Sequence, residues 1–413
     1  MELKDVYKVE ITGLDHNGRG ISKINNKVIF IEDALIGEVV DVEITHIKKD
    51  FLEGEVINYY EKSDFRVSPV CLYAKICGGC DIMHMPYFKQ LEYKENKVKN
   101  IMSKYLKMDG IVNPIVGSEN EVNYRNKLTL QVNEVIGLYK KKTYEIIKIE
   151  NCQLVDKKIN NILFEINKIG KFTNIDKIII RTSNINSMVI LDQKNYINNK
   201  PWIELGKTKN ISIISKYNSK YEVLHGDSYI NEYLNDYKFK ISPSAFFQIN
   251  IKQTINLYNK IKSLLENNDK VLDLYCGIGS IGIYVSDKVK ELVGVEINEE
   301  SVKNAEENKQ VNNVNCAKFY SGDVEKVINK IKFKPNIIIV DPPRSGLSLK
   351  TVDSLLKINA DKIIYVSCDP ITLARDLNKL KIKYNIAFIT PYDMFPNTSH
   401  VECVVLLTKK KSA

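Results

Sequence analysis

The second half of the chain alternates short apolar runs with stretches of helical spacing, and this alternation restricts the possible folds more than any other feature. The apolar runs are Val271–Leu274, Glu291–Glu296, Ile337–Val340 and Lys362–Ser367. Apolar strands that alternate with helices form a parallel sheet covered on both faces, and ligands bind at the carboxyl ends of its strands. We therefore expect a doubly wound α/β domain over residues 241–413, with functional side chains just after the strands.

The residues before this domain indicate two further domains. Short stretches rich in β-branched residues, separated by glycines, lie at 7–11, 27–31, 39–47 and 51–57. This pattern is typical of a small OB-like β-barrel, here over residues 1–60, which can be an RNA-binding scaffold or purely structural. Residues 61–240 contain a helical stretch at 85–110 and then strand-like runs with little helical periodicity. We expect a mostly β central domain, with the 85–110 helix packed on the C-terminal domain.

Composition limits the possible partners and compartments. Among 413 residues, 60 Lys and Arg outnumber 51 Asp and Glu, giving a formal charge of +9. This excess is compatible with RNA as a partner and equally with ordinary solvated surface. No apolar run approaches the roughly 18 residues of a membrane span, and the residues after Met1 lack the apolar core of a signal peptide. We expect a cytoplasmic monomer with no membrane partner and with reduced cysteines.

A glycine turn marks the candidate cofactor site. Val271–Gly279 is an apolar run followed by Gly-x-Gly, which lets the backbone approach a ligand, although this turn alone indicates only a nucleotide. The next strand ends in Glu296, placed to accept hydrogen bonds from ribose hydroxyls. Gly322-Asp323, suited to an adenine edge, and Asp341-Pro342-Pro343-Arg344 follow. The order resembles a Rossmann-like S-adenosylmethionine (SAM) methyltransferase rather than a nicotinamide enzyme.

Cys368 is a candidate nucleophile because it follows the apolar run that ends at Ser367. Core packing is the ordinary role of one cysteine among eight. At the ligand-binding edge of a sheet, however, a thiolate can attack a substrate, and an electropositive setting or a helix N-terminus favours that thiolate. Glu402 lies downstream as a candidate base, and His400 is the lesser candidate for that role.

Five separated segments occur in the order found in the RNA uracil-5 methyltransferase family: 242–248, 272–277, 341–344, 367–370 and 400–402. The N-terminal barrel also resembles that family's TRAM domain, so the resemblance covers nearly the whole chain. It implies an enzyme that methylates uracil carbon 5 in RNA with SAM. In this interpretation Cys368 adds covalently to carbon 6, Glu402 removes the carbon 5 proton, and the cofactor contacts are Gln248, Tyr275, Glu296 and Asp341.

The same resemblance implies roles around the substrate. Phe246 and Phe247 are candidates for holding a flipped base by stacking, although core packing suits at least one of them equally. The segment 123–127 (Asn-Tyr-Arg-Asn-Lys) resembles the family's basic motif near the active site. Asp323 is a further candidate cofactor contact.

Four cysteines form a candidate metal site: Cys71, Cys77, Cys80 and Cys152. Four reduced thiols can hold zinc or an iron-sulfur cluster, and the spacing alone does not decide between them. The family's ribosomal-RNA members carry this arrangement around a [4Fe-4S] cluster, whereas its tRNA members lack both the cysteines and the barrel. The resemblance therefore implies a structural [4Fe-4S] cluster and 23S rRNA as the substrate. The remaining cysteines, 276, 316 and 403, are expected to be tolerant core positions.

Other functions stay open at this stage. A tRNA uracil-5 methyltransferase would use the same chemistry on another RNA. An RNA cytosine-5 methyltransferase would also use it, but needs no carboxylate base in this motif and commonly places its nucleophile after a proline. A non-catalytic rRNA-binding protein could have kept the fold alone, although the presence of Cys368, Glu402 and the glycine turn weighs against that.

Overall fold

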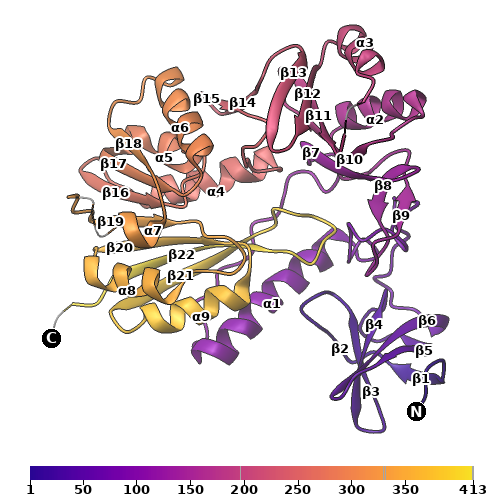
Figure 1. Ribbon diagram of the computed structural model, residues 1–413. Coiled ribbons are helices and arrows are strands. Elements are labelled where there is room, and N and C mark those ends of the chain that lie inside the picture. The colour runs from indigo at the N-terminus through magenta and orange to yellow at the C-terminus, as the bar shows by residue number, and fades with distance from the viewer. Residues whose placement is uncertain (196, 329, 331, 412–413) are drawn as a thin grey trace.

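The computed structural model describes residues 1–195, 197–328, 330 and 332–411. Three large sheets and one two-stranded hairpin account for the strands in these residues. The N-terminal sheet stands at one corner, the middle sheet lies above it, and the C-terminal sheet with its helices forms the other half (Figure 1). None of the helices in these ranges is both long and apolar enough to cross a membrane.

Six strands form the N-terminal sheet in the order β1-β5-β6-β4-β3-β2: Val6–Glu10 (β1), Gly13–Leu14 (β2), Gly20–Ile24 (β3), Lys27–Glu32 (β4), Val39–Ile47 (β5) and Phe51–Glu61 (β6). Alternating residues such as Ile29, Val42 and Leu52 point into one small core. The sequence did not predict β3, because Ser22 and Lys23 interrupt its apolar pattern. The expected barrel strands are present, but no recorded pair joins β1 to β2, so these residues form an open sheet rather than a closed barrel.

The middle sheet has seven strands in the order β13-β12-β11-β10-β7-β8-β9: Lys127–Val132 (β7), Ile136–Tyr139 (β8), Ile146–Lys148 (β9), Ile175–Thr182 (β10), Ser187–Gln193 (β11), Ser212–Tyr217 (β12) and Lys220–His225 (β13). Two helices pack here as well, Lys157–Ile169 (α2) and Lys200–Lys209 (α3). Helix α2 was not predicted from the sequence, although its buried residues Ile159, Leu163 and Ile166 recur at helical spacing among lysines and asparagines.

The C-terminal sheet has the order β18-β17-β16-β19-β20-β22-β21, and its pairs are parallel except those made by β22. Its strands are Asp269–Leu274 (β16), Val289–Glu296 (β17), Ala317–Ser321 (β18), Ile337–Val340 (β19), Lys362–Ser367 (β20), Tyr384–Tyr392 (β21) and Glu402–Lys409 (β22). The accompanying helices are Ile251–Ser263 (α4), Ser280–Tyr284 (α5), Glu299–Val311 (α6), Val324–Val327 (α7), Leu349–Ile358 (α8), Pro370–Leu380 (α9) and a 3-10 turn, Ser286–Lys288 (η1). The expected doubly wound α/β fold is confirmed.

Helix α1, Tyr87–Leu106, lies against the C-terminal sheet although it precedes that sheet by more than a hundred residues. Val98, Met102 and Leu106 are buried in the same core as residues of β20 and β22. The helix runs diagonally from beside the C-terminal sheet up towards β8 and β9 of the middle sheet (Figure 1). It therefore connects the active-site domain to the part of the chain that contains the cysteines.

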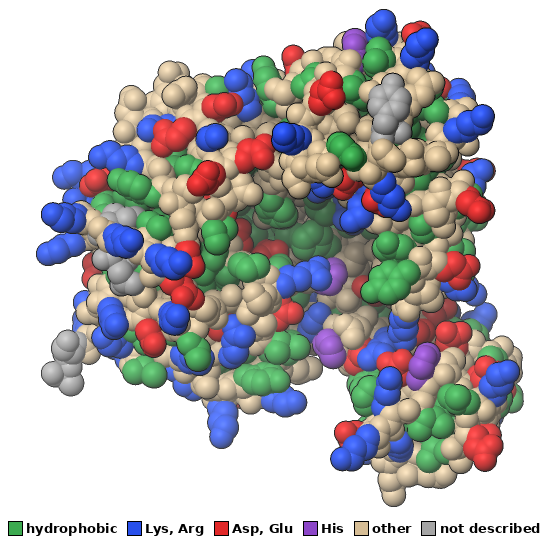
Figure 2. Space-filling model, in the orientation of Figure 1, with side chains coloured by type: hydrophobic (Ala, Val, Ile, Leu, Met, Phe, Trp, Pro, Cys, Tyr) green, Lys and Arg blue, Asp and Glu red, His purple; other side chains and the backbone are tan. Residues whose placement is uncertain are grey.

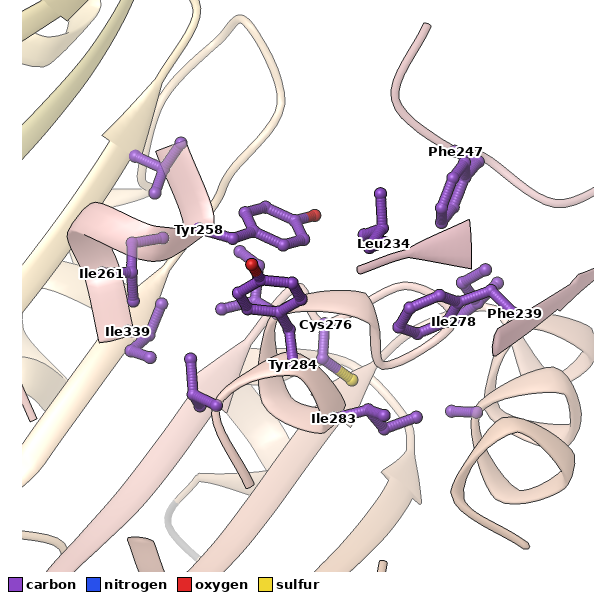
Figure 3. Close-up of a cluster of buried hydrophobic side chains, with 14 of the residues drawn as sticks. Leu234, Phe239, Phe247, Tyr258, Ile261, Cys276, Ile278, Ile283, Tyr284 and Ile339 are labelled. Atoms are coloured by element: carbon purple, nitrogen blue, oxygen red, sulfur yellow. The ribbon is translucent and has the colours of Figure 1, made fainter. Parts of the chain in front are cut away.

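A second core joins the middle and C-terminal sheets. The hairpin of β14 (Ile230–Leu234) and β15 (Tyr237–Ile241) contributes Leu234 and Phe239 to this core, beside Tyr258 of α4 (Figure 3). The rings of Phe239 and Phe247 are 5.7 Å apart, and Phe247 is 6% exposed. Phe247 is therefore a core residue, which resolves one of the two readings that the sequence left open for it.

Candidate active site

Several strands of the C-terminal sheet end side by side, and a candidate residue stands at or after each end. Leu274 of β16 pairs with Val340 of β19, so Tyr275 and Asp341 leave the sheet together. The Asp341 amide N–H donates a hydrogen bond to Leu274 O at 3.4 Å. Cys368 follows β20 and Glu296 ends β17. The fold thus brings these four predicted residues to one edge of the sheet, where parallel folds bind ligands.

The glycine turn after β16 is held in a conformation that few side chains adopt. Tyr275, with φ +63°, is in the left-handed region together with Gly277 and Gly279. The Glu296 carboxylate accepts hydrogen bonds from the amides of Gly277 (3.1 Å) and Asn298 (2.9 Å). A carboxylate has further lone pairs, so Glu296 can brace the turn and still accept from ribose hydroxyls. Backbone strain of this kind is found at ligand-binding turns.

Cys368 and Glu402 come together through the pairing of β20 with β22. Ser367 pairs with Cys403, which makes Cys368 and Glu402 the next opposing positions. Glu402 is 4% exposed. Burial, followed by the carboxylates of Glu402 and Asp341, raises the pKa of the Cys368 thiol to about 12, while Arg344 acts in the opposite direction. The predicted nucleophile and base are therefore neighbours, in a more acidic setting than the sequence suggested.

Three carboxyl groups crowd the same space. Burial, followed by the charge of Asp341, holds the pKa of Glu402 well above its usual value, and burial also raises the pKa of Asp341. Burial and the Asp341 charge raise the pKa of Asp273 to about 8. Like charges that are held close in a buried site cannot all ionise without a cation. The site is therefore suited to a ligand that carries positive charge, as the sulfonium of SAM does.

The segment that contains Gln248 lies beside the basic segment 123–127. Asn126 donates through its side-chain amide to Gln248 O at 3.2 Å and through its backbone N–H to Ile249 O at 3.0 Å. Phe246 is 68% exposed, in contrast to its buried neighbour Phe247. The fold therefore brings the predicted base-stacking ring and the predicted basic motif together, although they are more than a hundred residues apart in sequence.

Arg344 and His400 also lie at this edge of the sheet. Arg344 Nη2 lies 3.4 Å from His400 Nε2, and the Arg344 charge lowers the pKa of both Cys368 and Glu402. Burial, followed by the Arg344 charge, lowers the pKa of His400 to about 4, so its imidazole is neutral at ordinary pH. The Asp-Pro-Pro-Arg motif itself was the signal that could have identified Arg344. In the space-filling view, Lys, Arg and His side chains lie beside a central hollow (Figure 2).

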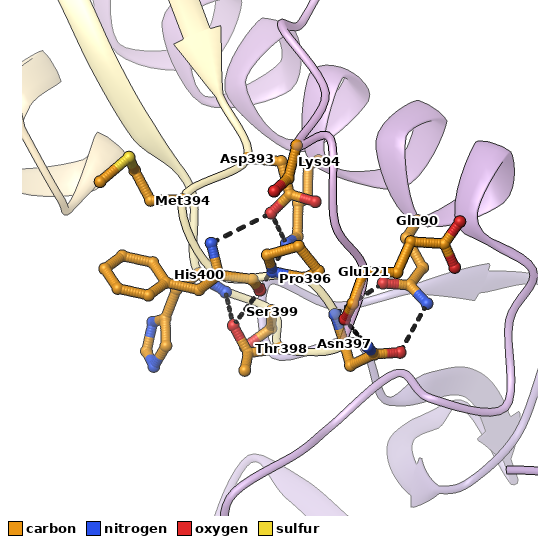
Figure 4. Close-up of polar contacts among 12 residues, drawn as sticks. Gln90, Lys94, Glu121, Asp393, Met394, Pro396, Asn397, Thr398, Ser399 and His400 are labelled. Atoms are coloured by element: carbon orange, nitrogen blue, oxygen red, sulfur yellow. Dashed lines mark hydrogen bonds and ion pairs between the residues drawn. The ribbon is translucent and has the colours of Figure 1, made fainter. Parts of the chain in front are cut away.

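A network of buried polar contacts holds the loop that leads into Glu402 (Figure 4). Lys94 Nζ of α1 donates to Asp393 Oδ1 at 2.5 Å, and both side chains are fully buried. Gln90 exchanges two hydrogen bonds with Asn397, at 2.8 and 3.1 Å. Asp81 accepts from the backbone N–H and the hydroxyl of Ser399 at 3.0 and 2.9 Å. The loop 393–401 is therefore fixed from outside its own domain, by α1 and by the residue after Cys80.

The four predicted metal ligands lie in one neighbourhood. Cys71, Cys80 and Cys152 pack around the same small core, and Cys77 is 8% exposed. Burial raises the pKa of Cys77, and the nearby thiols of Cys152 and Cys71 raise it further. Within the described part of the chain, however, no group of three or more His, Cys, Asp or Glu side chains is arranged to hold a metal ion. The four side chains lie near one another, and metal binding by them stays a prediction.

Comparisons with known proteins identify the family of this chain. Residues 86–410 match the model of the tRNA (uracil-5-)-methyltransferases, and residues 3–57 match the model of the TRAM domain. This chain belongs to the tRNA (uracil-5-)-methyltransferase family. An uncharacterized RNA methyltransferase of Clostridium tetani is 35% identical to this chain, and the match covers 97% of this chain and 96% of the relative. A relative in Staphylococcus aureus N315, of the same description, is 35% identical and covers 98% of both chains.

A solved structure extends the comparison to three dimensions. It is the Pyrococcus abyssi tRNA (uracil-54, C5)-methyltransferase in complex with S-adenosyl-L-homocysteine (SAH). It has a TM-score of 0.79 and 27% identity, and the match covers 97% of this chain and 100% of the other. Membership of the tRNA (uracil-5-)-methyltransferase family confirms a SAM-dependent RNA methyltransferase with an N-terminal TRAM domain. Because a tRNA enzyme matches almost the entire chain, the N-terminal sheet does not by itself favour ribosomal RNA.

Proposed function

We propose that the protein methylates uracil carbon 5 in RNA through a covalent bond between Cys368 Sγ and uracil carbon 6. The observation that carries the proposal is the pairing of β20 with β22, which sets Cys368 opposite Glu402. Addition of the thiolate turns the ring into an enolate, and this makes carbon 5 nucleophilic enough to be methylated. Glu402 then accepts the carbon 5 proton, and elimination of the thiolate restores the ring.

The cofactor end of the site lies at the carboxyl cluster. SAM supplies an electrophilic methyl group on a positively charged sulfur. In the proposal four residues would hold the cofactor: Asp341 would balance its positive charge, Glu296 would accept hydrogen bonds from its ribose hydroxyls, and Tyr275 and Gln248 would contact the rest of it. The raised pKa values of Asp341 and Asp273 support this assignment, because a bound cation relieves their mutual repulsion.

Two substitutions separate the steps of this scheme. Cys368→Ala should abolish the formation of 5-methyluridine while SAH binding, measured by calorimetry, stays close to that of the wild type. Glu402→Gln should permit addition and methylation but block proton removal, so a covalent protein–RNA adduct should accumulate on a denaturing gel. Methylation by the Cys368→Ala variant would refute the covalent scheme.

The proposed substrate is 23S rRNA, supported by the four-cysteine segment that resembles that of the ribosomal-RNA members. A tRNA substrate is the second candidate, favoured by the similarity to the Pyrococcus abyssi tRNA enzyme. Mapping 5-methyluridine by mass spectrometry in RNA from a strain without the gene decides between them. Loss from 23S rRNA supports the first, loss from tRNA supports the second, and loss of 5-methylcytidine instead would establish a cytosine-5 enzyme.

The proposal includes a [4Fe-4S] cluster on Cys71, Cys77, Cys80 and Cys152, with a structural role. A cubane binds one thiolate on each of four irons, so its ligands stand farther apart than the four ligands of one zinc ion. Its chemistry suits four thiols that are close neighbours without forming a single-ion site. Iron and sulfide analysis of protein purified without oxygen tests this, together with its visible absorption. Protein that contains stoichiometric zinc and no sulfide would exclude the cluster.

The proposal divides the chain into an RNA-binding domain (1–60), a central domain (61–240) and a catalytic domain (241–413), and it places a monomer in the cytoplasm. The proposed cluster needs four reduced thiols, and the cytoplasm keeps protein thiols reduced. Light scattering after size exclusion tests the oligomeric state. A dimer at micromolar concentration would contradict the monomer.

A further inference from the structure

Two cations lie directly opposite each other in the middle sheet. The register of β7 and β10 pairs Lys127 with Arg181, and like charges in opposed positions destabilise an antiparallel pair. Arg125 precedes Lys127 by two residues and adds a third positive charge, which also acts on Lys127. An arrangement that destabilises the free protein in this way is expected where an anion binds.

No carboxylate lies within ion-pair distance of these three cations in the part of the chain that the structure describes. None of the ion pairs found there includes Arg125, Lys127 or Arg181. Arg181 is 5% exposed, and the Nε atoms of both arginines are buried without a hydrogen-bond partner. Burial, followed by the charges of Arg181 and Arg125, lowers the pKa of Lys127 to about 8. Buried cations normally have an anionic partner.

The three cations border the active-site entrance. Arg181 Nη2 donates to Ala245 O at 2.5 Å, which anchors the residue before the exposed Phe246. Ile179, two residues before Arg181 in the same strand, packs against the core shared with the C-terminal domain. Asn126, between the other two cations, donates to Gln248 O. The contacts of Arg181 and Asn126 therefore fall one or two residues from Phe246, whose ring is proposed to hold the flipped uridine.

We propose that Arg181 and Lys127, supported by Arg125, bind one phosphodiester group of the RNA next to the nucleotide that enters the active site. A phosphodiester supplies the missing negative charge and two free oxygens, and an arginine fork matches those oxygens. The contact fixes the position of the backbone beside Phe246 and reads no base. The inference rests on the proposed function, because it assumes that the flipped uridine lies at Phe246.

Lys127→Met in the full-length protein provides the test, with Lys177→Met as the matched control. Lys177 is exposed at the other end of β10, and its substitution makes the same change of charge and shape. For a fluorescein-labelled uridine-containing RNA, Lys127→Met should weaken binding several-fold and reduce the slope of log K against log salt by roughly 0.7, the value for one phosphate on a single strand. The control should leave both unchanged.

A second readout distinguishes a phosphate site from a structural lysine. Since Lys127→Met removes repulsion, the melting temperature of the free protein should rise, and the further rise produced by inorganic phosphate in the wild type should disappear. A lower melting temperature with an unchanged salt slope would overturn the inference. A loss of SAH affinity with intact RNA binding would also overturn it, because the anion would then be the cofactor carboxylate. If the wild type forms no 5-methyluridine, the proposed function fails, while the comparison of RNA binding still decides the phosphate site.

Discussion

The buried ion pair between Lys94 and Asp393 permits a quantitative test of what holds the loop that leads to Glu402. Lys94 Nζ donates to Asp393 Oδ1 at 2.5 Å and to Phe395 O at 3.0 Å, and neither charged side chain is exposed to solvent. Lys94→Met keeps the length of the side chain but leaves the Asp393 carboxylate buried without its cation. Breaking one partner of a buried pair destabilises a protein by roughly 3–5 kcal/mol.

The double variant Lys94→Met/Asp393→Asn isolates the charge. The introduced asparagine is neutral and keeps an acceptor for the Phe395 N–H, which in the wild type donates to Asp393 Oδ1 at 3.3 Å. We therefore expect the double variant to recover most of the stability lost in Lys94→Met. Urea unfolding of the wild type, both single variants and the double variant measures the coupling energy. The turnover number should fall in Lys94→Met and recover in the double variant, while SAH affinity stays constant.

Lys99→Met is the matched control on the same helix. Lys99 pairs with Glu95 at 2.6 Å, but its side chain is 46% exposed, so its loss should cost less than about 1 kcal/mol. If Lys94→Met destabilises the protein no more than Lys99→Met does, the buried pair does not hold the loop. A double variant as unstable as the sum of the two single variants would refute the electrostatic reasoning as well.

Three further predictions follow from burial and backbone geometry. Burial raises the pKa of Asp341 above 3.8, so the folded protein keeps a proton that the unfolded chain releases. Stability without cofactor should therefore fall as pH rises from the unfolded pKa to the folded pKa of this carboxyl group. Thermal melts of Asp341→Asn should show a flatter decline. Phe246→Ala should slow methylation of RNA without changing the melting temperature, whereas Phe247→Ala should destabilise the fold by roughly 3–5 kcal/mol in urea; equal losses of stability would contradict the assignment. Gly137→Ala should lower the melting temperature, because the added Cβ would lie 1.8 Å from Ile147 O. An unchanged melting temperature would contradict this close approach of β8 and β9.

The C-terminal fold was predictable because its information is local. The parallel strands β16, β17, β19 and β20 each contain a short apolar run that is followed by a helix, so the pattern indicates the sheet, whereas β18 (AKFYS) lacks such a run and was not predicted. The strand β3 and the helix α2 were overlooked for the opposite reason. In β3, Ser22 and Lys23 interrupt the apolar pattern, and in α2 the apolar spacing is diluted by polar residues that face solvent.

The strand pattern alone points to residues that directly follow a strand, whereas Glu402 and Gln248 were not named from that pattern, and Gln248 was named only through the family resemblance. Cys368 and Asp341 directly follow strands, whereas the sequence around Lys94 gives no signal that this lysine is buried. In the structure Lys94 is on the buried face with Val98 and Met102, and its partner is 299 residues away. The position of that partner cannot be read from the sequence near Lys94. The same holds for Arg181, whose opposite neighbour Lys127 is known only from the register of two strands.

The carboxyl groups that suit this site to a sulfonium work against the proposed nucleophile, Cys368. Burial and the charges of Glu402 and Asp341 hold Cys368 as a thiol in the free protein, since its pKa is about 12. Arg344 opposes both carboxylates, but it is exposed and therefore screened by solvent. A positive charge bound beside Asp341 cancels the repulsion that this carboxylate exerts on a Cys368 thiolate. Helix α9 begins two residues after Cys368, and its N-terminus favours a thiolate once solvent is excluded. In the proposed mechanism the thiolate of Cys368 therefore forms in the complex with cofactor and RNA, and the free protein carries the less oxidisable thiol.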